Sequence, residues 1–475
     1  MLPQLSYSNN QILMNKRIFK DFRFWILVFF VLRLYGVTNP PIETGHSWRQ
    51  SFTCMVARNF LEEDPNIFYP RIDYSGARED VVPAEFPVFN YLIFLSAKVF
   101  GWQHWYGRLI NLIFTSIGIF FFYKLLRRYF GETTAFYAGI ILLSSIWFGF
   151  SRKIMPDTFS VAMAIIGIYY LSRYIDTNRV GNILLFILFA AIGGLSKIPT
   201  TVVLSISALA LFSKDVKFNQ KVTIASAGVS TVLIIAYWYF YWQPHLLETY
   251  GNKLYFPFPL MLGLQEVIRL WPQAIEKFYF DALHSFVAFF IFLTGMFLMV
   301  KRKETYLISI LLLTIVTFSF FIIKTGFVFP THSYYIIPFV PVMALIAGYG
   351  LSHLKIKNWA YLVLAVIAIE AILNQQHDFR LKQEEIYKTQ LEALADQLTE
   401  KSDKIAITGG LNPQEIYFIH RKGWSLFNKE ILDHDKIAKI KTQGCKYLFV
   451  NKHTLNQTLP YREIYSDENY IVYKL

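Results

Sequence analysis

Long apolar runs alternate with short polar segments through the first three quarters of the chain. The first run, FWILVFFVLRLYGV, extends from Phe24 to Val37 and follows a basic segment. Ten further runs lie near 109–123, 134–150, 158–172, 181–196, 200–213, 222–242, 283–300, 305–323, 334–352 and 359–374. A spanning helix needs about 20 apolar residues, and several runs are shorter. The pattern therefore predicts about eleven membrane-spanning helices, with each boundary placed to within a few residues.

Two polar regions flank or interrupt these runs: a loop at 38–86 and a tail after Asn374. The tail contains a strand-like KIAI from Lys404, a turn at Gly409-Gly410, a helical stretch at 413–420 and a second strand-like run, KYLFV, from Lys446. Such alternation predicts a small α/β or α+β domain. The expected fold class is a mainly α, polytopic membrane protein. We expect an N-terminal segment at 1–23, a transmembrane domain at 24–374 that includes the loop, and a soluble domain at 375–475.

The composition agrees with a membrane protein, and the distribution of charge argues against a nucleic-acid-binding protein. Apolar residues make up 54% of the chain and charged residues 17%, against about 25% charged in ordinary soluble domains. The net charge is +13, which in a soluble protein would suggest a nucleic-acid partner. With a cytoplasmic N-terminus, however, sixteen Lys and Arg fall in inner loops and four in short outer turns, Arg152, Lys153, Lys197 and Lys324. The charge therefore orients the chain, and we expect no nucleic-acid partner.

The same orientation places the loop 38–86 and the tail outside. Both cysteines, Cys54 and Cys445, then lie outside, and their helix-like and strand-like surroundings argue against a disulfide between them. The loop contains HSWRQSFTCMVARNFL from His46. On a helix, His46, Arg49, Gln50 and Thr53 share one face, opposite an apolar face. This pattern predicts an amphipathic helix on the outer membrane surface, and the simplest interpretation is an anchor with a solvated polar face.

Other ionisable residues also cluster at the predicted outer surface. Glu85 follows an acidic and basic stretch in the loop, and Asp157 follows Pro156 in the first turn of a predicted span, where the helix dipole favours a carboxylate. Lys197 separates two apolar runs, and His332 precedes another. Each residue has a structural interpretation, such as an interfacial lysine reaching to water. Together, cations and carboxylates at one depth favour an interfacial enzyme acting on a lipid-borne phosphate, whereas a transporter usually needs ionisable groups near the midplane.

Four motifs resemble the GT-C glycosyltransferases, in the branch of the protein O-mannosyltransferases and the lipid A aminoarabinose transferase. They are R-x-x-M-x-D from Arg152, L-S-K-x-P from Leu195, Gly107-Arg108-Leu109, and Y-x-x-P-x-x-P from Tyr335. Their order matches over roughly residues 20–375. The resemblance implies a GT-C-like fold and a polyprenyl-phosphate-sugar donor at the outer leaflet. It also implies transfer with inversion, Asp157 in the active site, and Lys197 and nearby Arg residues on the donor phosphate.

The chain differs from the family pattern at the positions that would supply the catalytic base. The family carries an acidic residue just before its surface helix, whereas this chain reads Gly45-His46-Ser47 there, with Glu43 nearby. The family's Lys-Pro-Pro before the next apolar run is replaced by Glu85-Phe86-Pro87. The base is then Glu43, Glu85 or His46, and we favour Glu85 supported by His46. The phosphate leaves as an anion, so no cofactor is required and a divalent metal is not indicated.

The sequence therefore predicts a glycosyltransferase of the bacterial inner membrane, with its C-terminal domain in the periplasm. The expected partners are a polyprenyl-phosphate-linked sugar, a periplasmic glycan, lipid or protein acceptor, and the bilayer. Residues expected to bind the donor are Arg49, Gln50, Arg152, Lys153, Lys197, His332 and Tyr335. A transporter or flippase of a lipid-linked sugar is the alternative, and a structural subunit of an envelope complex is a third interpretation.

Overall fold

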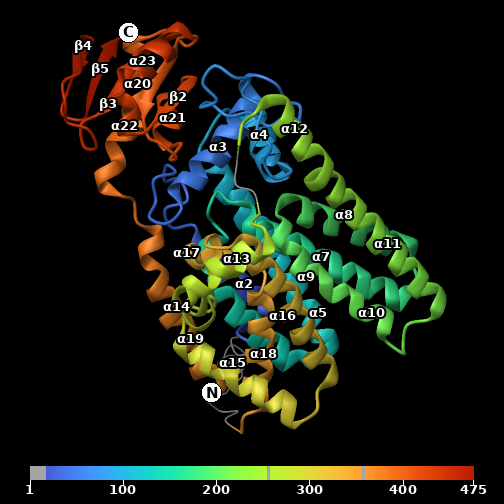
Figure 1. Cartoon of the computed structure of the whole chain (residues 1–475). Helices are drawn as coiled ribbons and strands as arrows, with labels where there is room; N and C mark the ends of the chain where they lie inside the picture. The colour runs from blue at the N-terminus through green and yellow to red at the C-terminus, as the bar shows by residue number, and fades with distance from the viewer. Residues whose placement is uncertain (1–17, 254–256, 356–358) are drawn as a thin grey trace, which may run out of the picture. The chain divides into compact units, whose positions relative to one another are not determined.

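The computed structural model describes residues 18–253, 257–355 and 359–475, and these form two compact units (Figure 1). The first unit takes in the described residues up to Val37, the stretch Arg108–Ala236 and the described residues from 257 to His377. The second unit takes in Thr38–Gly107, the described residues from Tyr237 to 253, and Asp378–Leu475. Most of the predicted N-terminal segment 1–23 lies outside the described residues, and so does Lys357 of the inner-loop cations.

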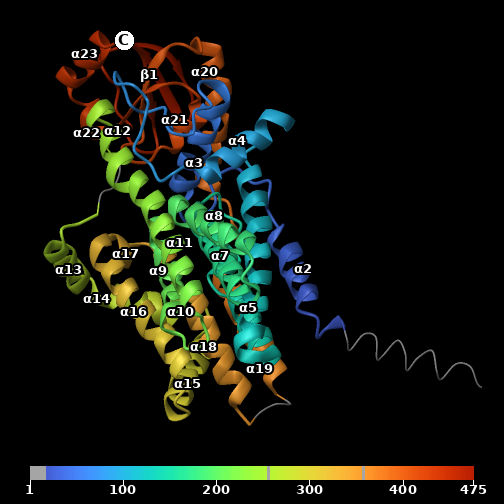
Figure 2. The same ribbon diagram turned by 90° about the vertical axis from the view of Figure 1, so that its right-hand side faces the viewer.

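Helices make up the described part of the first unit, and most of them coincide with the predicted apolar runs, whereas the helices at 260–281 and 328–331 lie between runs. They are α2 Phe22–Arg33, α5 Tyr106–Ser144, α6 Trp147–Phe150, α7 Pro156–Thr177, α8 Val180–Ser196, η1 Ile198–Thr200, α9 Thr201–Ser205, η2 Ile206–Ala208, α10 Leu209–Phe212, α11 Phe218–Ala236, α13 Leu260–Arg269, α14 Trp271–Glu276, η4 Lys277–Asp281, α15 Phe286–Lys301, α16 Thr305–Thr325, α17 Val328–Thr331, η5 Ser333–Ile336, α18 Val340–His353 and α19 Ala360–Gln375. Helices α7, α8 and α11 lie side by side (Figure 2). Within α5, Gly131 has φ 81° and ψ 168°, so two helices meet there, as the runs at 109–123 and 134–150 predict.

Length and composition identify fewer spans than the sequence pattern does. Five described helices are long and apolar enough to cross a membrane, and a bent pair, Trp271–Asp281 with Phe286–Lys301, makes a sixth if it is one span. Four more apolar helices have 10–17 residues, which is short for a full crossing. The chain is therefore mainly helical with five or six clear spans, and the expected number of eleven is not confirmed by this criterion.

The second unit combines the predicted loop with the C-terminal domain. Its helices are α3 Ser47–Glu62, α4 Val88–Phe100, η3 Tyr237–Trp242, α12 Gln243–Tyr250, η7 Gln383–Gln390, α20 Leu391–Leu398, α21 Gln414–Ile419, α22 Asn428–Ile431 and α23 His434–Thr442; η6 Gln376–Phe379 begins at the boundary between the units. Helix α3 confirms the predicted helix from His46 but corrects the interpretation of its polar face. Arg49, Gln50 and Thr53 are buried rather than solvated. Arg58 of the same helix bonds to Asp73 and packs over the Tyr417 ring, so α3 is integrated into this unit.

A five-stranded sheet forms the core of the C-terminal part. The strands are β1 Lys404–Thr408, β2 Gly423–Leu426, β3 Cys445–Asn451, β4 Arg462–Ser466 and β5 Tyr470–Lys474, in the order β2-β1-β3-β5-β4. Strand β1 is parallel to β2 and β3, and β5 is antiparallel to β3 and β4. The predicted strands from Lys404 and Lys446 and the helical stretch at 413–420 are confirmed. Both cysteines are free and buried, as expected.

Candidate functional site

The polar loop between α6 and α7, residues 151–155, is held in place by one amide side chain from α5. The Nδ2 atom of Asn111 lies 3.0, 2.8 and 3.2 Å from the carbonyl oxygens of Phe150, Lys153 and Met155. Thr158 donates to the Asn111 Oδ1 at 3.1 Å. A buried amide that satisfies several loop carbonyls fixes the loop backbone, because leaving those carbonyls unpaired is costly. Asn111 therefore positions the R-x-x-M-x-D segment, and the sequence analysis did not single it out.

Two arginines connect this region to the segment that follows α2. Arg152 donates to the carbonyl oxygen of Gly36 at 2.8 Å, and Arg108 donates to that of Val37 at 3.4 Å. Both arginines are fully buried, with 1% and 0% of their surface exposed. Burial of a guanidinium is costly unless its hydrogen bonds are satisfied, so this degree of burial marks both as parts of a built polar site rather than surface cations.

A further buried arginine comes from inside the first apolar run. Arg33, the last residue of α2, donates to Ser151 Oγ at 2.6 Å and to Ser116 Oγ at 3.1 Å. The sequence analysis missed it because a single cation within FWILVFFVLRLYGV is easily interpreted as part of the span. Ionisable residues within a membrane segment are rare and are usually functional, and that rule was the signal available.

The predicted active-site carboxylate lies beside the predicted phosphate-binding lysine. Pro156 begins α7, and Asp157 in its first turn lies 3.5 Å from the Lys197 ammonium. Lys197 follows the last residue of α8, and its amide donates to the Gly193 carbonyl. A Cβ atom at Gly193 would lie 2.8 Å from the Ser160 carbonyl oxygen of α7, so glycine permits the close helix contact that brings Lys197 to Asp157.

Aromatic rings surround the two lysines of this region. The Lys197 ammonium lies 5.7 Å from the centroid of the Tyr334 ring, and the Lys153 ammonium lies 5.5 Å from that of Phe150. The two rings contact each other, with centroids 6.0 Å apart. Aromatic faces attract cations without neutralising them, so these rings hold the ammonium groups and leave their charge for an anionic ligand.

His332 and Tyr335 belong to the same neighbourhood. Their rings lie 5.6 and 4.7 Å from the Tyr334 ring, respectively. Burial lowers the pKa of His332, and the charges of Lys277 and Lys197 lower it further, although a hydrogen bond with the Val328 carbonyl acts in the opposite direction. A neutral imidazole next to two lysines fits a hydrogen-bonding role better than a third positive charge. Lys277, which pairs with Asp281 at 2.6 Å, is another residue that the sequence analysis missed.

We call the first unit's charged residues around the loop the cationic cluster: Arg33, Arg108, Arg152, Lys153, Lys197 and Asp157. The cluster contains five cations and one carboxylate, and it is assembled from α2, α5, α7, α8 and the loop. A low-dielectric environment strengthens the attraction of such a group for anions. Phosphate oxygens are the natural ligands of Arg and Lys side chains held in this way.

The second unit contains the other predicted site residues. Arg49 of α3 forms an ion pair with Glu85, and the Arg49 guanidinium lies 5.0 Å from the centroid of the Phe52 ring. The backbone beside Glu85 is fixed, since Trp238 donates to the Ala84 carbonyl at 3.1 Å. The carboxylate of Glu85 is thus bonded to a cation. This pairing favours a role for Glu85 in orienting Arg49.

Glu43 and His46 lie in the turn that leads into α3. Glu43 is fully buried and accepts a hydrogen bond from Asn39 at 3.3 Å. Gly45 and His46 both have left-handed backbones, with φ of 77° and 58°. For a residue with a side chain this conformation costs about 1–3 kcal/mol, and such strain is concentrated at functional sites. His46 is half-buried, whereas Gln50, one turn into the helix, is fully buried.

The eleven predicted site residues therefore fall into two groups. Asp157, Lys197, Arg152, Lys153, His332 and Tyr335 lie in the first unit, and Glu43, His46, Arg49, Gln50 and Glu85 lie in the second. Their roles stay predictions. Among the described residues, no three His, Cys, Asp or Glu side chains gather in a way that would hold a metal ion.

Comparison with known proteins gives a clear result for the fold. Residues 82–242 match the family model of the dolichyl-phosphate-mannose-protein mannosyltransferases. The structure of ArnT from Cupriavidus metallidurans bound to undecaprenyl phosphate superposes with a TM-score of 0.61 at 12% identity, covering 95% of this chain and 98% of ArnT. No curated protein sequence matches the chain.

An archaeal enzyme matches as well. The oligosaccharyltransferase AglB from Archaeoglobus fulgidus, in complex with an inhibitory peptide and a dolichol-phosphate, superposes with a TM-score of 0.55 at 11% identity, covering 93% of this chain and 73% of AglB. ArnT and AglB are GT-C glycosyltransferases. This chain has the GT-C fold. The resemblance carried by the four sequence motifs is thereby confirmed, and the first unit with its cationic cluster belongs to a GT-C-like membrane protein.

Proposed function

We propose that this GT-C protein transfers a sugar from a polyprenyl-phosphate donor to an acceptor outside the cytoplasm, with inversion at the anomeric carbon. The observation that carries the proposal is the pairing of Asp157 with Lys197 in a cluster of five cations, four of which are buried. Two GT-C structures bound to a polyprenyl phosphate or a dolichol phosphate support the donor class. The acceptor is a glycan, a lipid or a protein.

In this proposal the cationic cluster holds the donor phosphate. As the glycosidic bond to phosphate breaks, negative charge grows on the departing phosphate oxygens. Lys197 and Arg152, supported by Lys153 and Arg33, stabilise that charge because they are fixed before the reaction begins. His332 and Tyr335 line the same region and contribute hydrogen bonds to the phosphate or the sugar. Since the leaving group is already an anion, the transfer needs neither a metal ion nor a cofactor in this mechanism.

Asp157 orients the acceptor in this mechanism. Its carboxylate accepts a hydrogen bond from the acceptor hydroxyl and keeps Lys197 at a fixed distance. Arg49 and Gln50 of α3 are further proposed donor-binding residues, and the Glu85 carboxylate holds Arg49 in its orientation. A bidentate or otherwise charge-assisted contact of this kind is about twice as strong as a neutral hydrogen bond.

In this mechanism His46, rather than Glu85, is the base that removes the proton from the acceptor hydroxyl. The sequence analysis favoured Glu85. Glu85 is paired with Arg49, whereas His46 is half-buried and has a strained backbone at the start of α3. An imidazole has an unperturbed pKa of about 6.5, close to that of an effective base at neutral pH. Glu43 is the second candidate for the base, since it lies three residues before His46 in the same turn.

The proposed location is the bacterial inner membrane, with the N-terminus in the cytoplasm and the loop 38–86 and residues 375–475 in the periplasm. The sixteen inner-loop cations support this orientation. We also propose that α5 makes two crossings, one on each side of Gly131, and that the shorter helices α2, α8, α9–α10 and α18 complete the crossings, giving eleven spans. Tilt and local thinning of the bilayer accommodate short spans at a modest cost.

The test uses purified protein in lipid nanodiscs with a radiolabelled polyprenyl-phosphate sugar and a membrane extract as the acceptor source. A transferase releases polyprenyl phosphate and labels an acceptor, whereas a flippase only moves label between leaflets. Asp157→Asn and Lys197→Ala should each lower transfer by at least about 100-fold, the usual effect of losing one electrostatic contact in the transition state.

Matched controls separate loss of the site from loss of folding. Asp215→Asn and Lys214→Ala change the same residue types at exposed positions away from the cluster and should leave transfer within about twofold, as surface substitutions generally do. Near-normal turnover in both site variants, with folded protein in the membrane, would overturn the site assignment. Relocation of label without release of polyprenyl phosphate would favour the flippase.

A further inference from the structure

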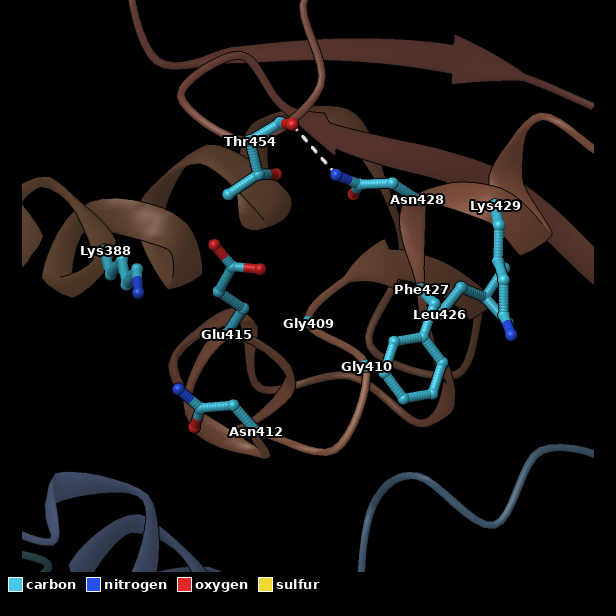
Figure 3. Close-up of a pocket in the computed structure, with 10 residues that line it drawn as sticks. All are labelled: Lys388, Gly409, Gly410, Asn412, Glu415, Leu426, Phe427, Asn428, Lys429 and Thr454. Carbon is cyan, nitrogen blue, oxygen red and sulfur yellow. Dashed lines mark hydrogen bonds between the residues drawn. The ribbon is translucent and has the colours of Figure 1, made fainter.

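A pocket whose chemistry differs from that of the cationic cluster lies in the C-terminal part of the second unit (Figure 3). It has a volume of about 440 Å³, within the range of about 300–1,000 Å³ that is usual for small-molecule sites. Its lining residues are Lys388, Gly409, Gly410, Asn412, Glu415, Leu426, Phe427, Asn428, Lys429 and Thr454. The proposed transfer reaction uses none of them.

The sheet topology explains why a pocket forms here. Gly409 to Asn412 follow β1, Phe427 to Lys429 follow β2, and Thr454 comes shortly after β3. These three strands are parallel, so their carboxyl ends share one edge of the sheet. The chain passes from β1 to β2 on one side and then returns past β1 to β3 on the other side, so the direction of strand addition reverses next to β1. Ligands of open α/β sheets bind at such a switch point.

A rigid carboxylate forms the floor of the pocket. Glu415 is 5% exposed, and its Oε1 accepts hydrogen bonds from the Asn451 amide and, at 3.3 Å, from the Tyr470 hydroxyl. In Figure 3 its carboxyl group points into the centre of the ring of lining residues. Two fixed partners hold the carboxyl group in one orientation. A ligand that bonds to this group therefore causes little further loss of side-chain conformational entropy.

Two amides and an aromatic ring complete the lining. Asn428 donates to the Thr454 carbonyl at 2.8 Å, as Figure 3 shows, and Asn412 accepts from the Gln414 amide at 3.1 Å. Both contacts fix planar side chains at the rim. The Phe427 ring is 44% exposed, although large apolar side chains are normally buried. It packs against Gly410, where a Cβ atom would come within 2.7 Å of the ring.

The pocket does not suit a phosphate. The backbone amides of Gly409 and Gly410 both donate to the Leu426 carbonyl, at 3.1 and 3.0 Å, so they do not form an open cradle of N–H groups. Lys388 bonds to Gln414 at 3.0 Å and pairs with Glu385 at 3.5 Å. Glu415 presents a carboxyl group to the pocket rather than a cation. A neutral ligand with many hydroxyl groups fits this lining better.

We propose that this pocket binds a saccharide. A pyranose ring presents hydroxyl groups at its edge, which pair with the Glu415 carboxyl group and with the amides of Asn412 and Asn428. Its C–H face is apolar and packs on an exposed aromatic ring such as Phe427. The Lys429 ammonium lies 5.9 Å from the Phe427 ring centroid and adds a donor at the rim. The saccharide is a unit of the acceptor glycan or the sugar of the lipid-linked donor.

The test measures binding directly and does not depend on transferase activity. Full-length protein in lipid nanodiscs is mixed with methyl glycosides of mannose, glucose, galactose and N-acetylglucosamine, and saturation-transfer NMR detects bound sugar. Maltoside detergents are avoided because their headgroups are themselves saccharides. At least one glycoside should bind, and Phe427→Ala should weaken that binding at least about fivefold, the lower range for loss of an aromatic contact. Asn428→Ala tests the amide without altering the sheet.

Leu432→Ala is the matched control, because Leu432 is 43% exposed in the same domain but does not line the pocket. This variant should bind as the unaltered protein does. Absence of any glycoside signal, or a signal that persists unchanged in folded Phe427→Ala and Asn428→Ala proteins, overturns the proposal. Binding of inorganic phosphate in place of the glycosides also overturns it. Once an acceptor is known, a rise in KM for the acceptor alone assigns the saccharide to the acceptor, and a rise for the donor alone assigns it to the donor.

Discussion

The cationic cluster and the C-terminal pocket are both polar sites, but they differ in the charge and type of their side chains. The cluster contains five cations held by helix ends and backbone carbonyls, with Asp157 as its carboxylate. The pocket contains amides, an exposed Phe427 ring and the buried Glu415, and its glycine amides are already bonded. Fixed positive charge selects phosphate, whereas planar amides and an aromatic face select neutral hydroxylated rings. In the proposed function, the cluster holds the phosphate of the donor and the pocket holds a sugar.

The largest expected effect concerns the base, which belongs to neither of these two sites. His46→Gln should lower kcat/KM by about 100- to 10,000-fold, the usual contribution of general base catalysis. In the unaltered protein, activity should fall as the pH drops through the imidazole pKa, because only the neutral imidazole accepts a proton. Measuring kcat/KM against pH tests this. If Glu43→Gln abolishes the fall of kcat/KM at low pH and His46→Gln preserves that fall, Glu43 is the base.

A smaller loss is expected for a cation of the cluster. Arg152→Ala should reduce transfer by about 100-fold, because it removes a fixed positive charge next to the developing phosphate charge. The same substitution should leave glycoside binding in the C-terminal pocket unchanged. Parallel transfer and saturation-transfer measurements on one preparation check both expectations. Equal losses in the two assays would contradict the claim that the cluster and the pocket bind different parts of the substrates.

Removing the side chain that positions the loop should lower transfer less than removing one of the cations does. Asn111→Ala removes the amide that holds three loop carbonyls, and buried unsatisfied groups of this kind cost about 1–3 kcal/mol each. We expect a lower thermal unfolding temperature and a fall in kcat that Asn111→Gln does not rescue. Thr115→Ala, one turn along α5, serves as the control. Unchanged stability in Asn111→Ala would show that the loop holds its shape by other contacts.

The smallest expected effect is a pH dependence of stability within the second unit. Burial lowers the pKa of His420, but hydrogen bonds with Glu392 and Glu62 raise it more, so the net shift is upward. The hydrogen bond from His420 is the main cause that lowers the pKa of Glu392 to about 2. A raised folded-state pKa stabilises the protein below the unfolded value of about 6.5, and this contribution is lost as the pH rises through the folded value. His420→Gln should flatten this dependence in thermal unfolding between pH 6 and 9, and a curve parallel to that of the unaltered protein would contradict it.

The sequence predicted the fold better than the site. Apolar runs located most helices of the first unit, although those at 260–281 and 328–331 were not predicted, and Gly131 separates two helices where two runs were expected. Alternating polar and apolar residues located β1, α21 and β3. Strands β2, β4 and β5 were not predicted. The exposed positions of β4 give little hydrophobic signal, and β2 has only four residues and depends on Gly423, whose Cβ would clash with Ile405 across the pair.

Motifs identified only part of the site. Asp157 and Lys197 were predicted to act together because a helix start and a break between runs placed both at the outer surface, and the structure brings them to 3.5 Å. Arg33 and Asn111 lie inside apolar runs, where one polar residue is masked by its neighbours. The Arg49–Glu85 pair was not predicted, because it joins residues 36 positions apart through tertiary contacts that no local pattern encodes.

Affinity for undecaprenyl phosphate, measured with purified protein in nanodiscs, tests the central claim most directly. Undecaprenol, which lacks the phosphate, is the matched ligand. The unaltered protein should bind the phosphate form at least about tenfold more tightly than the alcohol, a difference of about 1.4 kcal/mol. Lys197→Ala should erase most of that preference, and Phe427→Ala should keep it. Equal affinity for the two lipids, or a preference that survives Lys197→Ala, would contradict a phosphate site in the cationic cluster.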